Sequence, residues 1–269
     1  MGETIDLSRY RVPGSYETFY IPDFITVDEE QYLLRKIAET PQSKWKQLAN
    51  RRLQIWGGEV TSKNVLFSQG MPSFLGSYPD IITRLRNTGA FSSSPHGAPN
   101  HVILNEYLPG QGIMPHQDGP SYYPVVATIS IGSHSVFHYY KFNTQDDQTS
   151  YETGPLWPED RDDGRIINRT PVLTVFLEPR SLVISRELMY ISHLHGIEGT
   201  FQDRIFRKDK NKAPTVTDLN VDIANWEMLS GQEIKKVIEE GGILPRNVRY
   251  SLTCRDVERV LNAHQFMRR

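Results

Sequence analysis

Short apolar runs of strand length dominate the chain from residue 101 onward. Residues that favour turns separate these runs, an arrangement typical of antiparallel sheets. A last run follows a long polar stretch and returns to the same pattern. The second half of the chain is therefore predicted to be mainly β. The six runs are residues 101–107, 124–132, 135–142, 170–178, 181–186 and 248–254.

The first hundred residues mix helical and strand patterns. Thr26 followed three residues later by Glu29 is a capping box, which predicts the start of a helix. Apolar residues at helical spacing extend this helix to about Ala38. The other elements predicted here are a strand over 16–21, paired strands within 45–60, a helix near 77–87 and a loop over 89–99.

A helical layer followed by many short strands favours a mainly β fold with flanking helices. We expect a double-stranded β-helix (jelly roll) with an N-terminal helical layer, rather than a doubly wound fold. Since no linker is evident, residues 1–269 are predicted to form one domain. Its helical and lid part would span about 16–100, and the jelly roll would span about 101–269.

Two polar insertions are expected in the roll. The stretch near 143–169 is rich in Asp and is predicted to be a surface loop. The stretch near 199–245 is predicted to carry a helix over about 231–240. After the last strand, Asp256 is expected to cap a final helix from about Val257.

Composition and charge exclude several classes of protein. The 269 residues carry a net charge of −2, so no global basic field points to nucleic acid or to an anionic membrane. Nucleic acid is not excluded, because a local basic groove is enough to bind it. Cys254 is the one cysteine, which rules out an intrachain disulfide and a cysteine-based zinc site. The chain shows neither a secretory signal nor an apolar stretch of membrane-spanning length. We therefore expect a soluble intracellular protein, which we assign to the cytoplasm and nucleus as a monomer with no membrane partner.

A candidate metal site begins with a histidine and an aspartate. His116 and Asp118 lie two residues apart, so on a strand both side chains would point to one face and reach one ion. Two histidines and one carboxylate form the facial triad of non-haem Fe(II) oxygenases, which leaves positions open for a 2-oxo acid and dioxygen. An isolated pair of this kind is more often a hydrogen-bonded surface pair than a metal site. The interpretation therefore needs a third ligand.

Two later histidines are candidates for that third ligand. His193 and His195 lie two residues apart in the run ISHLHGIEG, and the pattern of residues does not decide between them. The glycine that follows His195 would let a neighbouring backbone approach the site closely.

The last predicted strand presents a candidate carboxylate-binding face. In the run RYSLTCR, every second residue from Arg249 to Arg255 would face one way. A guanidinium binds a carboxylate through two parallel hydrogen bonds, and an inward-facing arginine needs such a partner. The alternative is an edge strand whose arginines face solvent. The four residues of this face are Arg249, Ser251, Thr253 and Arg255.

Together these segments resemble the AlkB family of Fe(II)/2-oxoglutarate-dependent dioxygenases. The matching pieces are NEYLPGQGIMPHQD, HGI and RYSLTCR, in the family's order, and the resemblance covers most of the chain from Pro22 onward. It implies that His116, Asp118 and His195 bind Fe(II), with 2-oxoglutarate and dioxygen as cosubstrates. It also implies oxidation of an N-methyl carbon, with release of formaldehyde, carbon dioxide and succinate.

The resemblance further implies a cosubstrate site. Asn105 and Tyr107 stand where the family binds 2-oxoglutarate. Arg249 would bind the distal carboxylate, and Arg255 would lie by the carboxylate nearest the iron. Ser251 stands where some relatives carry Asn, so its hydrogen bond would have a shorter reach.

A substrate-binding lid is expected in the N-terminal part. Residues 50–58, NRRLQIWGG, resemble the nucleotide-recognition lid of the family. Arg51 and Arg52 could contact phosphate, and Trp56 could stack on a base. The alternative is a solvated arginine pair and a core tryptophan. Two further candidates, at the pocket entrance or in the core, are Tyr122 and Tyr123.

Three functions compete at this stage. The first is demethylation of alkylated bases in RNA or DNA, which requires the base to be single-stranded or flipped. The second is a dioxygenase that acts on a protein side chain. The third is a catalytically silent binding module with the same fold. The complete set of ligands and arginines argues against the third, but the sequence does not separate the first two.

Overall fold

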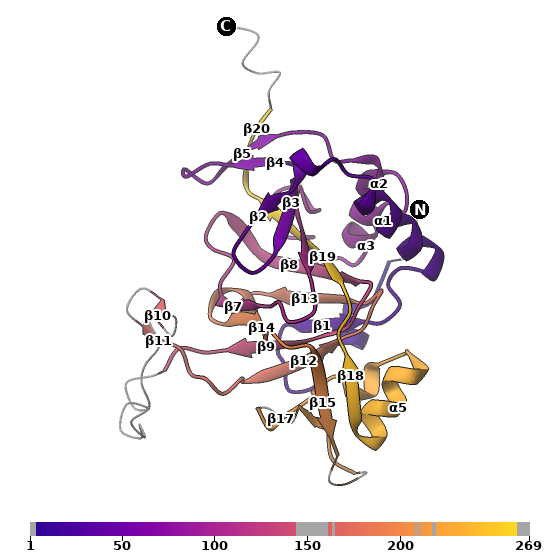
Figure 1. Ribbon diagram of the computed structural model, residues 1–269. Helices are drawn as coiled ribbons and strands as arrows, with labels where there is room; N and C mark the ends of the chain where they lie inside the picture. The colour runs from indigo at the N-terminus through magenta and orange to yellow at the C-terminus, as the bar shows by residue number, and fades with distance from the viewer. Residues whose placement is uncertain are drawn as a thin grey trace, which may run out of the picture.

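Two antiparallel sheets face each other, and a layer of helices covers the outer face of the larger sheet (Figure 1). This computed structural model describes residues 4–143, 161–162, 165–207, 209, 211–216 and 219–262. The facing sheets confirm the predicted jelly roll with an N-terminal helical layer.

The strand order places the segments with candidate chemistry at the centre. The larger sheet runs β1 (Thr18–Ile21), β13 (Leu182–Arg186), β8 (Tyr122–Ile131), β19 (Arg249–Val257), β6 (His101–Tyr107), β3 (Arg52–Trp56) and β2 (Lys46–Gln47). The smaller sheet runs β12 (Leu173–Leu177), β9 (Ser135–Tyr140), β14 (Leu194–Ile197) and β7 (Ile113–His116). All six predicted strands are present, with ends shifted by a few residues.

The first helix, α1 (Val27–Ala38), begins and ends where the sequence predicts. The Thr26 hydroxyl accepts a hydrogen bond from the Glu29 amide at 3.2 Å, and the Glu29 carboxylate accepts one from the Thr26 amide at 2.8 Å. The capping box is therefore confirmed. With 12 residues α1 is the longest of the described helices, none of which has both the length and the apolar character needed to cross a membrane.

The helix predicted near 77–87 is shorter than expected and forms only α3 (Ile81–Asn87), while a separate short helix, α2 (Ser73–Gly76), precedes it. Pro79 lacks a backbone amide donor, and Asp80 adopts a left-handed conformation with φ 51°. The Asp80 carboxylate then caps α3 by accepting from the Thr83 amide at 3.2 Å. A proline followed by a capping residue therefore delays the start of this helix to Ile81.

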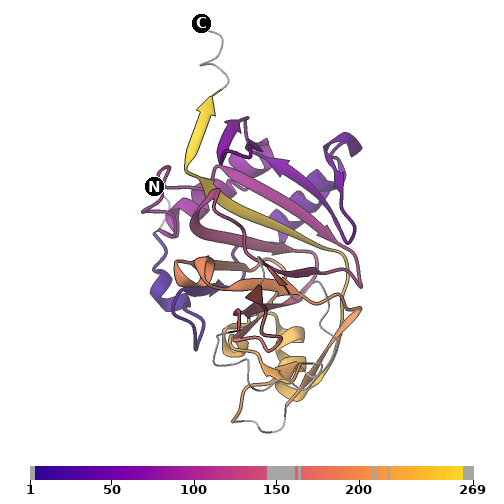
Figure 2. The ribbon, with the colours of Figure 1, turned by 90° about the vertical axis from the view of Figure 1, so that its left-hand side faces the viewer.

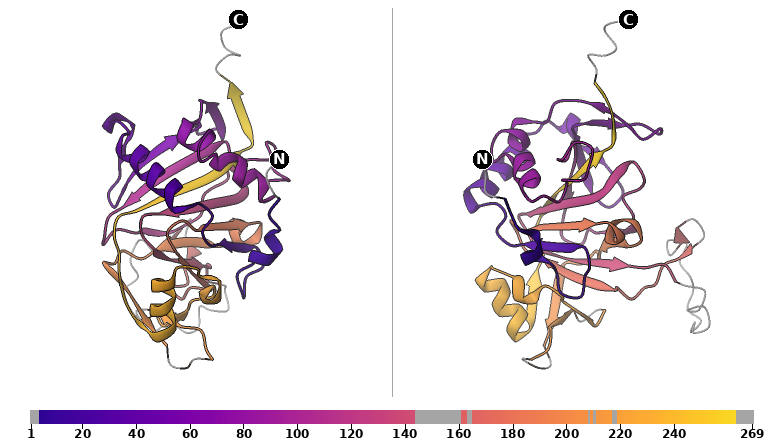
Figure 3. Two further views of the ribbon diagram at one scale, coloured as in Figure 1. Left: turned by 90° about the vertical axis from the view of Figure 1, so that its right-hand side faces the viewer. Right: turned by 180° about the vertical axis from the view of Figure 1, so that it is seen from behind.

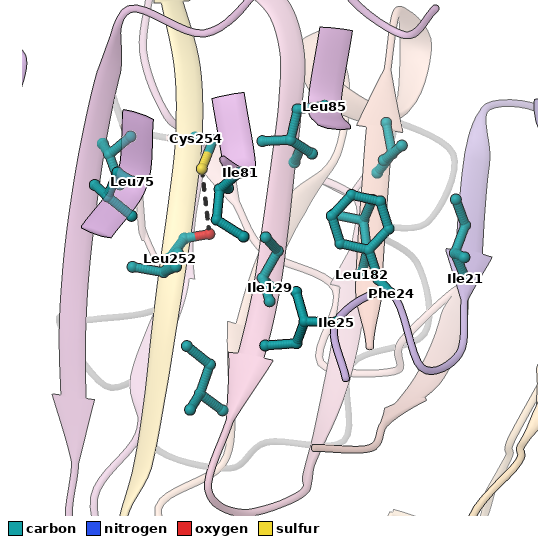
Figure 4. Close-up of a cluster of buried hydrophobic side chains, with 14 of the residues drawn as sticks. Ile21, Phe24, Ile25, Leu75, Ile81, Leu85, Ile129, Leu182, Leu252 and Cys254 are labelled. Atoms are coloured by element: carbon teal, nitrogen blue, oxygen red, sulfur yellow. Dashed lines mark hydrogen bonds between the residues drawn. The ribbon is translucent and has the colours of Figure 1, made fainter. Parts of the chain in front are cut away.

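Apolar side chains join the helical layer to the larger sheet. Leu75, Ile81 and Leu85 from the helices pack against Ile129 and Leu252 of the sheet (Figure 4). Since neighbours on a strand alternate in direction, burial of Leu252 turns the residues on either side of it towards the smaller sheet. The packing of the helices thus fixes which face of β19 looks into the space between the sheets.

The second insertion forms a separate small layer at the end of the molecule away from α1, α2 and α3 (Figures 1 and 3). The predicted helix is confirmed as α5 (Gln232–Glu240). Four strands beside it were not predicted, because they are too short or too polar to show an apolar alternation. In sheet order they are β17 (Val221–Asp222), β16 (Thr215–Val216), β15 (Gln202–Phe206) and β18 (Gly242–Pro245).

Most of the first insertion, 143–169, lies outside the described residues. Its described part contains a small two-stranded pairing of β10 (Arg161–Asp162) with β11 (Arg165–Ile166). The surface loop expected there stays a prediction.

The predicted final helix is wrong. Strand β19 continues to Val257, and β20 (Arg259–Asn262) then pairs in parallel with β5 (Val65–Ser68), which is antiparallel to β4 (Gly58–Val60) (Figure 2). Asp256 does not cap a helix, because its buried carboxylate accepts hydrogen bonds from the amide and ring of His96 at 3.1 and 2.7 Å. A tertiary partner replaces the local cap that the sequence suggested.

Candidate metal and cosubstrate site

A cavity of about 230 Å³ lies between the two sheets. Side chains from β6, β8 and β19 of the larger sheet and from β7, β9 and β14 of the smaller sheet line it. Eleven of the predicted site residues are among them. They are Arg51, Asn105, Tyr107, His116, Asp118, Tyr122, His195, Arg249, Ser251, Thr253 and Arg255.

Three potential metal ligands converge in this cavity. One ligand atom each from His116, Asp118 and His195 lie within 4.8 Å of one another. The two histidines are register partners on β7 and β14, with ring centroids 4.4 Å apart. The expectation that Asp118 lies on a strand is wrong, because β7 ends at His116. Asp118 reaches the same point from the loop that follows, with Oδ1 3.9 Å from Nε2 of His195.

The structure separates the two histidines that the residue pattern left equal. His193 is outside the cluster and is buried, with its Nδ1 3.0 Å from the Leu188 carbonyl. The glycine after His195 brings two backbones together, since a Cβ at Gly196 would lie 3.0 Å from the Ile113 carbonyl oxygen. His195, with this close approach beside it, is therefore the histidine placed to bind a metal ion.

The charge states of these groups suit metal binding. Burial lowers the pKa of both His116 and His195, so each ring is neutral and carries a free lone pair near pH 7. Burial opposes ionisation of Asp118, but the charge and hydrogen bond of Arg255 and the two neighbouring histidines together outweigh it and lower the Asp118 pKa to about 2. Two neutral imidazoles and one carboxylate are the donor set of the facial triad.

Several buried polar atoms in the cavity have no hydrogen-bond partner. They include Oδ2 of Asp118, Nε of Arg249, and Nε and Nη1 of Arg255. A buried polar atom left unpaired costs about 1–3 kcal/mol, so such atoms call for a ligand. A metal ion at Asp118 and a dicarboxylate beside the two arginines would satisfy all four. The site therefore fits both Fe(II) and 2-oxoglutarate.

The arginine face of β19 is interior. Strand β19 lies between β8 and β6, which overturns the alternative of an edge strand. Arg249 is opposite Tyr107 in the register, its Cζ is 5.5 Å from the tyrosine ring centroid, and its Nη2 donates to the Ser130 hydroxyl at 2.8 Å. Arg255 forms a short ion pair with Asp118. One arginine thus lies against a metal ligand and the other remains available for a carboxylate.

Strand alternation sends three of the five predicted substrate residues away from the cavity. Arg52 forms two hydrogen bonds to Glu106 at 2.6 and 2.7 Å. Trp56 packs edge-on against Phe74 of α2, with ring centroids 5.7 Å apart. Tyr123 packs against the same core, under the helices. Their assignment to a substrate site is therefore corrected to structural roles.

Arg51 and Tyr122 do line the cavity, and Arg51 makes a contact that the sequence did not indicate. Its Nε donates to Oδ1 of Asn105 at 3.0 Å. The predicted lid is in fact the β2–β3 hairpin, which faces the helices with one side and the cavity with the other. A second missed feature is Phe137, whose ring stacks on His195 at 5.3 Å between centroids. The sequence signal that could have found Phe137 is the alternation of side chains along β9, which turns Phe137 towards the cavity.

We expect Trp56→Ala to destabilise the fold by about 2 kcal/mol, because it removes part of the contact between α2 and the larger sheet. Thermal unfolding should show a lower melting temperature, while affinity for oligonucleotides stays unchanged. Loss of oligonucleotide affinity without a change in melting temperature would contradict the core assignment.

Two facing sheets that enclose a His–Asp–His cluster and a buried arginine have the architecture of Fe(II)/2-oxoglutarate oxygenases. Comparison with known proteins assigns the family. No protein-family model matches the chain. A zebrafish (Danio rerio) protein named "Probable RNA/DNA demethylase ALKBH6" is 34% identical over 264 residues, which cover 98% of this chain and 95% of that protein. The chain belongs to the AlkB family of Fe(II)- and 2-oxoglutarate-dependent dioxygenases and is a homologue of ALKBH6.

Other relatives are more distant. An Arabidopsis thaliana protein named "Alkylated DNA repair protein ALKBH8 homolog" is 27% identical over 217 residues, which cover 76% of this chain and 58% of that protein. The solved structure of OsALKBH1 matches 92% of this chain and 98% of its own at 13% identity, with a TM-score of 0.47. A 2OG-Fe(II) oxygenase family structure from Burkholderia pseudomallei matches 97% of this chain and 100% of its own at 11% identity, with a TM-score of 0.46.

Proposed function

We propose that this protein demethylates alkylated bases in RNA or DNA, with Fe(II), 2-oxoglutarate and dioxygen. The observation that carries the proposal is the convergence of three metal-ligating side chains and a buried arginine in one cavity. His116, Asp118 and His195 would hold the iron. When bound, Fe(II) supplies the activation of dioxygen that oxidises a methyl carbon.

The remaining residues of the cavity would bind and orient the cosubstrate. Arg249 would use its unpaired Nε and a terminal nitrogen to bind the distal carboxylate. Asn105 and Ser251, which are register partners on β6 and β19, lie on the same wall. Arg255 would keep Asp118 ionised and present its unpaired nitrogens to the carboxylate nearest the metal. Ile113 and Phe137 supply apolar walls that reduce the access of water.

The surroundings of the cavity suit an extended substrate such as a nucleic-acid strand. A second cavity of about 530 Å³ adjoins the first, since Ile113 and Ile197 line both. The β2–β3 hairpin contributes Arg51 to the first cavity and Asn50 to the second. These features support a strand with a target base in one cavity and its continuation along the other. The name of the zebrafish relative, "Probable RNA/DNA demethylase ALKBH6", supports the same choice.

The proposal is tested by incubating methylated RNA and DNA oligonucleotides, and methylated peptides, with the protein, Fe(II) and 2-oxoglutarate. Mass spectrometry should show loss of methyl groups from an oligonucleotide, together with release of formaldehyde and succinate. The Asp118→Ala protein is the matched control. Oxidation of the peptides alone would overturn the nucleic-acid substrate in favour of a protein side chain.

The two neighbouring arginines of the hairpin should behave differently. Arg51→Ala should weaken oligonucleotide binding and lower the log–log salt slope by about 0.7–0.9, the value for one phosphate contact. Arg52→Ala should leave that slope unchanged, because its guanidinium is bound to Glu106. Binding measured over a series of salt concentrations tests both. Equal slopes for Arg51→Ala and the wild type would remove the phosphate contact from the proposal.

A further inference from the structure

The Asp118 ligand lacks the support that the two histidines have. His116 and His195 lie on paired strands, where ladder hydrogen bonds hold the backbone. Asp118 comes two residues after the end of β7, so no strand pairing fixes it. The partners that orient metal ligands typically contribute 10–100-fold to metal affinity. Another part of the chain must therefore hold this loop.

The short helix α4 (Leu188–Ile191) holds the loop on both sides of Asp118. The Gln117 side-chain amide donates to the Ile191 carbonyl at 2.6 Å. The Tyr190 hydroxyl donates to the Gly119 carbonyl at 3.1 Å. These two bonds join α4 to the residues immediately before and after the ligand.

The roll in turn holds α4. Met189 is 5% exposed and packs in the core between the sheets. Glu187, directly before the helix, has φ 49° and ψ −120°, a backbone conformation that residues other than glycine rarely adopt. Its amide donates to the Pro124 carbonyl at 3.0 Å. Strained residues of this kind persist where the surrounding structure over-determines them. Strand β14, which carries His195, begins three residues after α4.

We propose that α4 is a brace for the metal site, in which Tyr190 is a positioning residue for Asp118. The inference rests on the metal site proposed above. A tyrosine hydroxyl is protonated at neutral pH, so Tyr190 donates its hydrogen bond to the Gly119 carbonyl. Tyr190 therefore fixes the carbonyl beside Asp118 without binding the metal itself.

The test measures Mn(II) binding to the full chain by calorimetry in the absence of 2-oxoglutarate. Tyr190→Phe removes the hydroxyl but keeps the ring, and it should weaken Mn(II) binding on the order of tenfold. Gln117→Leu removes the second bond and should weaken binding in the same direction. It also keeps the test available if Tyr190→Phe fails to fold. The matched control is Tyr20→Phe, which removes a buried tyrosine hydroxyl bonded to Glu178 at 2.7 Å, away from the metal site.

The expected pattern is weaker Mn(II) binding for Tyr190→Phe and Gln117→Leu, and wild-type binding for Tyr20→Phe even where its melting temperature falls. Wild-type affinity in both brace variants would overturn the brace while leaving the metal site intact. An equal loss in Tyr20→Phe would assign the effect to general stability and would also overturn it. Absence of Mn(II) binding by the wild type would overturn the metal site and the brace together.

Discussion

Replacing His116, Asp118 or His195 with alanine should abolish metal-dependent turnover of 2-oxoglutarate. The cluster supplies one ligand atom from each residue, and two remaining ligands do not hold an ion in the facial geometry. Succinate formation, measured by mass spectrometry with and without Fe(II), tests the loss. Circular dichroism of the metal-free variants checks that each remains folded. This check matters most for Asp118→Ala, which leaves the Arg255 charge buried without its partner.

His193→Ala is the matched control for His195→Ala. Both histidines lie in one short run, but His193 contacts the Leu188 carbonyl and is absent from the metal-ligating cluster. Turnover should therefore survive its replacement. Loss of turnover in His193→Ala, together with normal turnover in His195→Ala, would reverse the ligand assignment.

Alternation along strands made much of the site predictable. The spacing of Arg249 and Arg255 requires both side chains to share a face, and the structure places both in the cavity. The central position of β19 was not predictable from that spacing, because an edge strand has the same alternation. It depends on pairing with β6 and β8, segments more than a hundred residues away in sequence.

The same alternation explains why Arg52, predicted to contact substrate from the lid, does not face the cavity. Arg51 and Arg52 are adjacent, so at the start of a strand they must point to opposite sides of the sheet. The two arginines therefore do not act as one phosphate-binding pair. The sequence alone does not say which of the two faces the cavity. That choice depends on the helical layer, which packs against Trp56 and so turns Arg52 to the same side of the strand.

Local signals failed where a distant residue offered a better partner. Asp256 has the residue type of a helix cap, but the His96 ring and amide occupy its carboxylate. Asp118 has the spacing of a strand residue, but β7 ends before it, and α4 holds its loop. Capping boxes such as that of Thr26 and Glu29 are predictable because both partners lie within one turn.

Arg249→Ala should weaken 2-oxoglutarate binding by about 2–5 kcal/mol, because it leaves a carboxylate unpaired in a closed cavity. Arg249→Lys should also bind poorly, since an ammonium does not reproduce the two parallel hydrogen bonds of a guanidinium. Calorimetric titration of 2-oxoglutarate into the Mn(II)-loaded protein measures both. Ser251→Ala is a milder control on the same strand face. Wild-type affinity in both Arg249 variants would show that another group binds the distal carboxylate.

The pH dependence of that affinity gives an independent check on Arg249. Burial lowers its pKa to about 10, and the Arg246 charge acts in the same direction while Tyr107 opposes it. The binding form is the cation, so affinity should stay constant across neutral pH and fall as the pH rises through about 10. An arginine with an ordinary pKa would keep its charge well beyond that point. Arg249→Ala should lose this alkaline decline and show only the weak residual binding. If the decline persists in Arg249→Ala, a different group titrates there, and the assignment of the carboxylate to Arg249 fails.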